Sequence, residues 1–191
     1  MDYTPKDLTF SQEGREKLIK GINKLSEAVK STLGPSGNTV LIESQHHTHG
    51  MTVTKDGVTV AKSIDLLDPV ENLAVRLMKQ AADKTATNAG DGTTTAIVLT
   101  EALVMSVIDQ VRESGNEITM TDITRELDVI SKDVVSQVKK ASKKLSQRRL
   151  LDVATISSNN DKSLGRLIAD TYTHVGGKHG VVLVDRSKTQ H

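Results

Sequence analysis

The 191-residue sequence contains no cysteine and no tryptophan, and its aromatic residues are Tyr3, Phe10 and Tyr172. Without cysteine the chain has no disulfide framework, no thiol nucleophile and no cysteine-based zinc site. Three aromatic rings leave almost nothing on which bases could stack, which argues against binding of single-stranded nucleic acid. The 25 basic and 24 acidic residues give a formal net charge of +1, so charge favours no class of partner.

The sequence also lacks obvious targeting signals. No apolar run is expected to reach the roughly 18 residues of a membrane span. Residues 1–5 lack the charged and apolar regions of a signal peptide. The length suggests one domain or two small ones. We therefore expect a soluble protein of the cytoplasm, where the absence of cysteine suits a reducing environment.

Residues 90–95, Gly-Asp-Gly-Thr-Thr-Thr, are the most informative run. They precede a strongly apolar segment that predicts a buried core helix. The first turn of this helix would then be its only solvent-exposed part. Free backbone N–H groups and the positive end of the helix dipole favour an anion there. Asp91 would repel a bare phosphate, which favours a Mg²⁺ ion between them. The alternative is an ordinary N-cap, with Asp91 or Thr93 as the capping residue between two turn glycines.

A second glycine-containing segment follows a predicted amphipathic helix over residues 11–33, with Ser11 as its cap. The helix leads into a tight turn, Thr32-Leu33-Gly34-Pro35-Ser36-Gly37, that can bring backbone close to a ligand. Two short strands are predicted at 40–43 and 51–54. Lys55-Asp56-Gly57 then turns the chain into Val58-Thr59-Val60 and supplies a cation and a carboxylate.

The rest of the pattern predicts a mostly α-helical protein with small β-hairpin elements, an α+β fold. Further helices are expected over 69–88, 93–112 and 122–145, and a shorter one capped by Asp161 extends through Tyr172. Gly176-Gly177 ends that helix, and 180–185 has the composition of a buried strand. The polar stretch 142–149 is predicted to be a domain joint.

Three motifs, in this order and at these separations, resemble the group I chaperonins, the GroEL family. They are Thr-Leu-Gly-Pro-x-Gly from Thr32, Thr-Lys-Asp-Gly-Val-Thr-Val-Ala from Thr54, and Ala-Gly-Asp-Gly-Thr-Thr-Thr-Ala from Ala89. The resemblance continues through 153–157 and 175–185. The last motif is neither a Walker A loop, since no Gly-Lys-Ser/Thr follows, nor a dinucleotide fingerprint.

The resemblance implies an ATPase site with ATP, Mg²⁺ and K⁺ as ligands. Asp91 is the implied Mg²⁺ ligand, and Asp56 is the implied catalytic carboxylate near the attacking water. The implied K⁺ contacts come from Thr32, Lys55 and Thr94. The full set of implied nucleotide-site residues is Thr32, Leu33, Gly34, Pro35, Lys55, Gly90, Asp91, Gly92, Thr93, Thr94, Thr95, Ile156 and Ser157.

The resemblance further implies a subunit of a homo-oligomeric ring, expected to be seven-membered, that refolds non-native polypeptides. A co-chaperonin lid is a possible partner, whereas binding to nucleic acid or to a membrane is not expected. Residues 1–140 would be the N-terminal half of an equatorial ATP-binding domain. Residues 141–191 would be the ascending part of an intermediate domain.

The sequence stops at His191, where relatives enter the apical domain, so apical and returning segments are expected to be missing. The isolated chain is then expected to be inactive. The alternative is a truncated, non-catalytic subunit that co-assembles with a full-length ring or modulates it.

Two departures from the family pattern stand out. Asn38-Thr39 replaces the usual arginine and asparagine, which puts contacts at the ring interface in doubt. The predicted hairpin tip at 44–50 is long and polar and carries His46, His47 and His49. A metal site there is an open alternative to solvated loop histidines.

Overall fold

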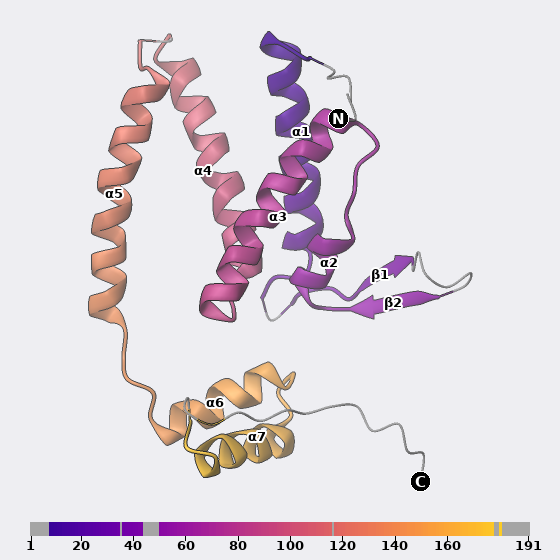
Figure 1. Cartoon of the computed structure of the whole chain (residues 1–191), viewed down its shortest axis with the longest axis vertical. Coiled ribbons are helices and arrows are strands. Elements are labelled where there is room, and N and C mark those ends of the chain that lie inside the picture. The colour runs from indigo at the N-terminus through magenta and orange to yellow at the C-terminus, as the bar shows by residue number, and fades with distance from the viewer. Residues whose placement is uncertain (1–7, 35, 44–49, 116, 178–179, 181–191) are drawn as a thin grey trace, which may run out of the picture. The chain divides into compact units, whose positions relative to one another are not determined.

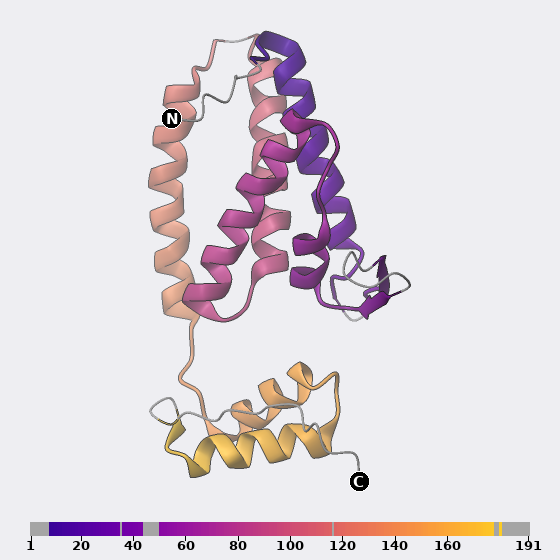
Figure 2. The same ribbon diagram turned by 45° about the vertical axis from the view of Figure 1, so that its right-hand side comes forward.

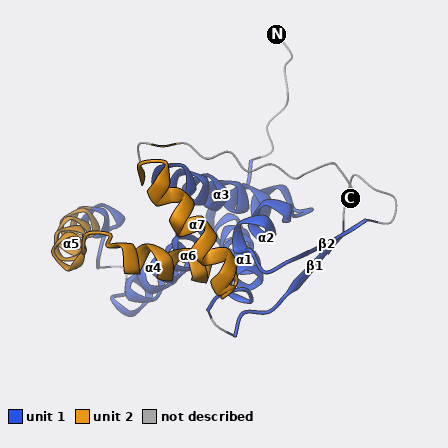
Figure 3. Cartoon of the chain, turned by 90° about the horizontal axis from the view of Figure 1, so that it is seen from below, with its two compact units in different colours: residues 1–124 blue, residues 125–191 orange. Residues whose placement is uncertain are grey.

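The computed structural model describes residues 8–34, 36–43, 50–115, 117–177 and 180. The chain divides into two compact units, residues 1–124 and 125–191 (Figure 3). Within the described residues, helices predominate and the strands form one antiparallel hairpin. The predicted fold class is therefore confirmed.

Unit 1 contains three long helices, one short helix and the hairpin (Figure 1). In chain order these elements are α1 (Ser11–Lys30), β1 (Val40–Glu43), β2 (Met51–Thr54), α2 (Gly57–Ser63), α3 (Pro69–Ala89) and α4 (Thr93–Glu113). The strands pair in a register that places Val40 opposite Thr54 and Glu43 opposite Met51. α5 (Met120–Ala141) begins in unit 1 and continues into unit 2, which also holds α6 (Gln147–Ser157) and α7 (Lys162–His174).

The core of unit 1 lies where α1, α2, α3 and α4 meet, and α1, α3 and α4 run side by side in Figure 2. Burial of apolar side chains in this cluster supplies most of the driving force for folding the unit. The buried members are Leu25, Val29, Val60, Ala61, Val75, Met78, Ala82 and Ile97. The amphipathic spacing of α1 thus correctly predicts that Leu25 and Val29 face the core.

Both ends of α1 differ from the prediction. Phe10, in extended conformation, precedes the helix, and Ser11 is its first residue with a left-handed φ of 60°. Ser11 is therefore not the cap, because an N-cap needs extended backbone to aim its side chain at the first N–H groups. The helix ends at Lys30 rather than at residue 33, and the Thr32 hydroxyl donates to the carbonyl of Val29 at 2.8 Å.

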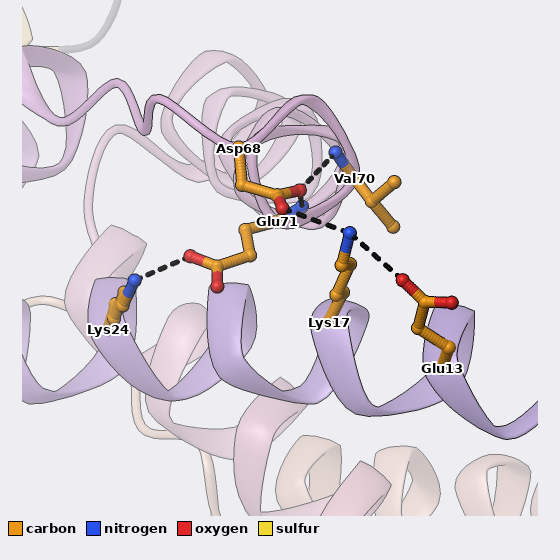
Figure 4. A network of polar contacts seen from close by, with 6 residues as sticks. All are labelled: Glu13, Lys17, Lys24, Asp68, Val70 and Glu71. Carbon is orange, nitrogen blue, oxygen red and sulfur yellow. Dashed lines mark hydrogen bonds and ion pairs between the residues drawn. The ribbon is translucent and has the colours of Figure 1, made fainter. Parts of the chain in front are cut away.

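α1 and α3 approach most closely at Gly21. An added Cβ there would collide with the backbone carbonyl oxygen of Glu71. Charged side chains join the two helices on both sides of this point (Figure 4): Lys24 Nζ lies 2.5 Å from Glu71 Oε2, and Lys17 Nζ lies 3.3 Å from a carboxylate oxygen of Asp68. The missing side chain of Gly21 permits the close approach, and an ion pair lies on each side of it.

Asp68 also caps α3, as its carboxylate accepts hydrogen bonds from the N–H groups of Val70 and Glu71 at 2.8 and 3.1 Å. The pKa of Asp68 is lowered, first by the hydrogen bond from the Glu71 N–H and then by the Val70 N–H and Lys17. These contributions outweigh desolvation, which raises the pKa. Hydrogen bonds to Asp68 and Glu13 raise the pKa of Lys17. Both groups are therefore charged at neutral pH, which is the state that cap and ion pair require.

The predicted apolar faces of the other long helices are partly wrong. The spacing within 69–88 predicts an apolar side made of Leu73, Leu77, Met78, Ala81 and Ala82. α3 instead buries Ala74, Val75, Met78 and Ala82, whereas Leu73 and Leu77 are exposed. The spacing within 122–145 likewise predicts an apolar stripe, made of Ile123, Leu127, Ile130, Val134, Val138 and Leu145. α5 buries none of its residues. Periodicity identifies an apolar face, but only neighbouring elements decide whether it is covered.

α4 is not the buried core helix that its composition predicts. Only Thr93 and Ile97 are buried, because α1, α2 and α3 pack against one side of it. α4 also contradicts the prediction that no run is long enough to span a membrane, since an 18-residue window in it reaches a mean hydropathy of 1.4. One such helix is weak evidence of a span, because core helices of soluble proteins have the same length and composition.

Ser26 lies in the middle of α1 with none of its surface exposed, and its hydroxyl has no hydrogen-bond partner among the described residues. A buried hydroxyl without a partner destabilises the fold. We expect Ser26→Ala to raise the free energy of unfolding of unit 1 by about 1 kcal/mol. Urea unfolding followed by circular dichroism measures this change, with Ser106→Ala, at an exposed position of α4, as control for helix propensity. A gain no larger than that of the control would contradict the prediction.

In unit 2, α6 and α7 pack against each other. Gly165 of α7 makes this possible, since an added Cβ would lie 2.6 Å from the Cα of Thr155 in α6. The predicted cap at Asp161 is confirmed, and the Leu164 N–H, the Ser163 hydroxyl and the Ser163 N–H lower the pKa of Asp161.

The ends of unit 2 differ in part from the prediction. α5 stops at Ala141 instead of reaching 145, and Ser146 caps α6 by accepting a hydrogen bond from the Arg149 N–H, so residues 147–149 are helical rather than part of a joint. The left-handed Gly176 and Gly177 follow α7 as predicted. The strand predicted at 180–185 lies outside the described residues except for Gly180.

Candidate functional site

Three segments that are far apart in the sequence meet at Gly57. A Cβ added to Gly57 would collide with the Thr94 hydroxyl and would lie 3.0 Å from the Thr32 hydroxyl oxygen. These residues belong to the turn after α1, the start of α2 and the first turn of α4. The structure thus brings together one residue from each of the three sequence motifs.

The first turn of α4 has the features of an anion site. Gly90 ends α3 and Gly92 precedes α4, both in the left-handed conformation with φ of 76° and 91°. No side chain among the described residues caps α4 at Gly92, so the first N–H groups of the helix remain available. Thr93 is buried, while Thr94 and Thr95 are nearer the surface. A phosphate fits this arrangement, since backbone N–H groups and the dipole favour negative charge.

Asp91 lies between the two left-handed glycines and is exposed. One of its carboxylate oxygens accepts a hydrogen bond from the Gly92 N–H at 2.6 Å. Asp91 therefore does not cap α4 from the N-cap position, contrary to one of the two sequence interpretations. The other carboxylate oxygen makes no hydrogen bond within the described residues, so it could serve as a ligand of a hard cation.

The described residues contain no group of three or more His, Asp or Glu side chains that could hold a metal ion by itself. An ion at Asp91 would therefore need oxygens from another source. Mg²⁺ bound to nucleotide phosphates meets this condition, because it commonly uses one or two carboxylates and completes its shell with phosphate and water. His46, His47 and His49 lie outside the described residues.

Asp56 is the N-cap of α2. Its carboxylate accepts hydrogen bonds from the Thr59 N–H at 2.9 Å, the Thr59 hydroxyl at 2.6 Å and the Val58 N–H at 3.3 Å. Partial burial raises the pKa of Asp56, but these three bonds and the charge of Lys62 outweigh it and lower the pKa below its ordinary value. Asp56 is thus ionised at neutral pH and already has a structural role that the sequence interpretation missed. The Asp-x-x-Thr spacing is the signal that could have shown it.

The turn after α1 places the other predicted residues. Gly34 is left-handed with φ of 79°, and the Gly37 N–H donates to its carbonyl at 3.0 Å. Leu33 is exposed, and Pro35 lies outside the described residues. Lys55 is exposed between β2 and α2, next to Asp56. The turn therefore closes on itself beside Thr32, as expected of a segment that approaches a ligand.

Ile156 and Ser157 occupy the end of α6 in unit 2, and both are exposed. Their contact with a nucleotide held by unit 1 stays a prediction. The sequence interpretation assigned no site role to Gly57, which the structure places between Thr32 and Thr94, and it did not foresee the ion pair between Lys30 and Glu101. Only Gly57 had a sequence signal, namely its place in the Lys-Asp-Gly motif.

By fold and site together, the described residues form a helical domain in which three segments meet beside an uncapped helix N-terminus. Residues 25–190 match the model of the TCP-1/cpn60 chaperonin family. The chain therefore belongs to the TCP-1/cpn60 chaperonin family. The comparisons do not establish the group I subfamily.

Solved structures of chaperonins agree with this assignment. Two crystal forms of the chaperonin gp146 from the bacteriophage EL 2 (Pseudomonas aeruginosa), obtained in the presence of ATP-BeFx, match with a TM-score of 0.73 and 31% identity. The matches cover 85% and 86% of this chain and 28% of the gp146 chain. A group III chaperonin in the open state matches at a TM-score of 0.69 and 24% identity, over 85% of this chain and 32% of its own, and supports the fold.

Proposed function

We propose that this chain is part of an ATP-dependent chaperonin subunit of the group I type, and that unit 1 binds the phosphates of ATP. The convergence of Thr32, Gly57 and Thr94 carries the proposal, because the missing Cβ leaves backbone and hydroxyls free to approach a ligand. The gp146 structures with ATP-BeFx support a nucleotide as that ligand.

In this proposal each part of the site has a separate role. The first turn of α4 holds phosphate oxygens, and Asp91 shares a Mg²⁺ ion with them. Thr32, Lys55 and Thr94 contact K⁺. Asp56, ionised through its cap bonds, orients the attacking water, and hydrolysis then depends on positioning and charge neutralisation.

We further propose that the subunit works in the cytoplasm in a homo-oligomeric ring that refolds non-native polypeptides. Exposed apolar side chains on α3 and α4, such as Leu73, Leu99 and Leu103, support an assembly in which other protein covers them. The chain spans 28% of the gp146 chain it matches. A seven-membered ring, a co-chaperonin lid and ATP turnover are therefore parts of this proposal. A non-catalytic subunit that modulates a ring is the alternative, and the exposed surface favours it equally.

Calorimetric titration of the 191-residue chain with ATP, with Mg²⁺ or with a chelator, tests the proposal. We expect weak ATP binding that Mg²⁺ strengthens, and negligible turnover. Asp91→Asn preserves the acceptor for the Gly92 N–H but removes the charge, and it should reduce the Mg²⁺ enhancement about tenfold, the value of one lost charged contact of 1.4 kcal/mol.

Asp109→Asn is the matched control, since Asp109 is an exposed aspartate of α4 that lies away from the first turn of the helix. It should bind Mg²⁺ and ATP as the unchanged chain does. An Asp91→Asn variant with the full Mg²⁺ enhancement would remove Asp91 from the metal site. Absence of ATP binding to the unchanged chain would favour the non-catalytic alternative.

A further inference from the structure

We infer that the ion pair between Lys30 and Glu101 is a positioning contact, which sets the separation of the two threonine-bearing turns of the proposed phosphate site. Lys30 Nζ lies 2.6 Å from Glu101 Oε2. The inference rests on the proposed function, because the turns matter only if they hold a nucleotide. Neither residue touches the proposed ligand, so each would act through the turn beside it.

On α4, Glu101 shares a helix face with the site. Thr94, Ile97 and Glu101 are spaced by three and four residues, which places them on one stripe. Thr94 adjoins Gly57, Ile97 is 1% exposed in the core, and Glu101 binds Lys30. One stripe of a rigid helix therefore connects the ion pair to the first turn, so a shift at Glu101 moves Thr94.

On α1, Lys30 is the last residue of the helix and lies two residues before Thr32. The Thr32 N–H and hydroxyl both donate to the carbonyl of Val29, at 3.1 and 2.8 Å. The turn is thus tied to the last residues of α1. Holding Lys30 against α4 holds Thr32 as well.

α1 and α4 also meet in the apolar core, through Leu25 and Val29 of α1 and Ile97 of α4. Among the described residues, the bond from Lys30 to Glu101 is the side-chain hydrogen bond that connects these two helices. Apolar packing is non-directional and favours burial without defining how far one helix slides along the other. A charge-assisted hydrogen bond adds the missing directional restraint.

Exposure determines what should change when the pair is removed. The side chain of Glu101 is 14% exposed and that of Lys30 is 40% exposed, so solvent reaches one side of the pair. Such pairs contribute little to global stability. A positioning role therefore predicts a small change in the urea midpoint but a loss of ATP affinity, which we expect to be about fivefold, the upper end for a partly exposed pair.

The test compares the 191-residue chain with Glu101→Gln, Lys30→Gln and the charge exchange Lys30→Glu with Glu101→Lys. Calorimetry gives the affinity for ATP with Mg²⁺, urea unfolding gives stability, and hydrogen exchange reports on residues 31–34 and 90–96. Asp83→Asn is the matched control, since it removes another interhelical ion pair of unit 1, between Lys62 and Asp83.

Both single variants should lose ATP affinity about fivefold and exchange faster at the two turns, while Asp83→Asn does neither. The charge exchange should recover at least half of the loss, recovery being incomplete because glutamate is unfavourable at the end of a helix. If the unchanged chain binds ATP and Glu101→Gln matches Asp83→Asn, the inference is wrong and the proposed function stands. If the unchanged chain binds no ATP, the proposed function fails and the inference with it.

Discussion

Replacing Gly21 with alanine is expected to lower the free energy of unfolding of unit 1 by about 3 kcal/mol. The added Cβ would collide with the carbonyl oxygen of Glu71 and lie 2.9 Å from its carbonyl carbon and 3.0 Å from its Cα. These are backbone atoms inside α3, so no side-chain rotation relieves the collision. α1 and α3 must separate, which weakens the core around Leu25 and Val75 and the ion pair between Lys24 and Glu71.

Gly14→Ala is the matched control for this effect, because Gly14 is also a helical glycine of α1. Its nearest neighbour would be the carbonyl oxygen of Thr9, at 3.3 Å and before the helix, where the chain can adjust. The gain in helix propensity, about 1 kcal/mol, applies to both variants. Urea unfolding followed by circular dichroism compares them. Equal urea midpoints for the two variants would show that the close approach of α1 and α3 does not affect the free energy of unfolding.

Replacing Gly57 with alanine is expected to raise the dissociation constant for ATP about a hundredfold, since one or two lost hydrogen bonds to a charged phosphate, at about 1.5–3 kcal/mol each, cost that much. The Cβ would occupy the position of the Thr94 hydroxyl and crowd that of Thr32. Thr94 is β-branched and has few alternative rotamers in a helix, so the start of α2 must move away from α4. The atoms that collide are side-chain hydroxyls, and we therefore expect the fold to remain.

The cause of this effect can be isolated by a second substitution. In a Thr94→Ala background the colliding hydroxyl is absent, so Gly57→Ala should add much less than it does to the unchanged chain. Calorimetry with ATP and Mg²⁺ measures the unchanged chain and the three variants, and urea unfolding verifies that each is folded. An undiminished effect of Gly57→Ala in the Thr94→Ala background would exclude the collision as its cause.

Local sequence signals predicted the helices well where a capping residue accompanies the apolar period. Asp161 begins α7 as predicted, and Pro69 and Gly90 bracket α3. The prediction failed where the signal was ambiguous, as at Ser11, which has the right chemistry for a cap but a left-handed backbone. α6 was missed because its polar start, Gln147 to Arg149, has the composition of a linker.

The sequence by itself determined membership of the chaperonin family, the order of the glycine-containing motifs and the candidate ligands, because these depend on residue types at short spacings. Asp91, Lys55 and Asp56 are identifiable in this way. Which residues are buried could not be identified from the sequence, as the exposed Leu73 and the largely exposed α4 show. The spacing of apolar residues predicts which face a helix could bury, but it does not predict which other element packs against that face.

Only the tertiary structure decided which motifs meet. Gly57 contacts Thr32 and Thr94, which are 25 and 37 residues away in the sequence, and Lys30 reaches Glu101 across 71 residues. These contacts join α1, α2 and α4, and no local pattern encodes which of these elements meet. Interactions between distant segments depend on how complete helices and strands pack against one another. Residue spacing therefore identified the candidate site residues, but only tertiary packing showed which of them lie close together.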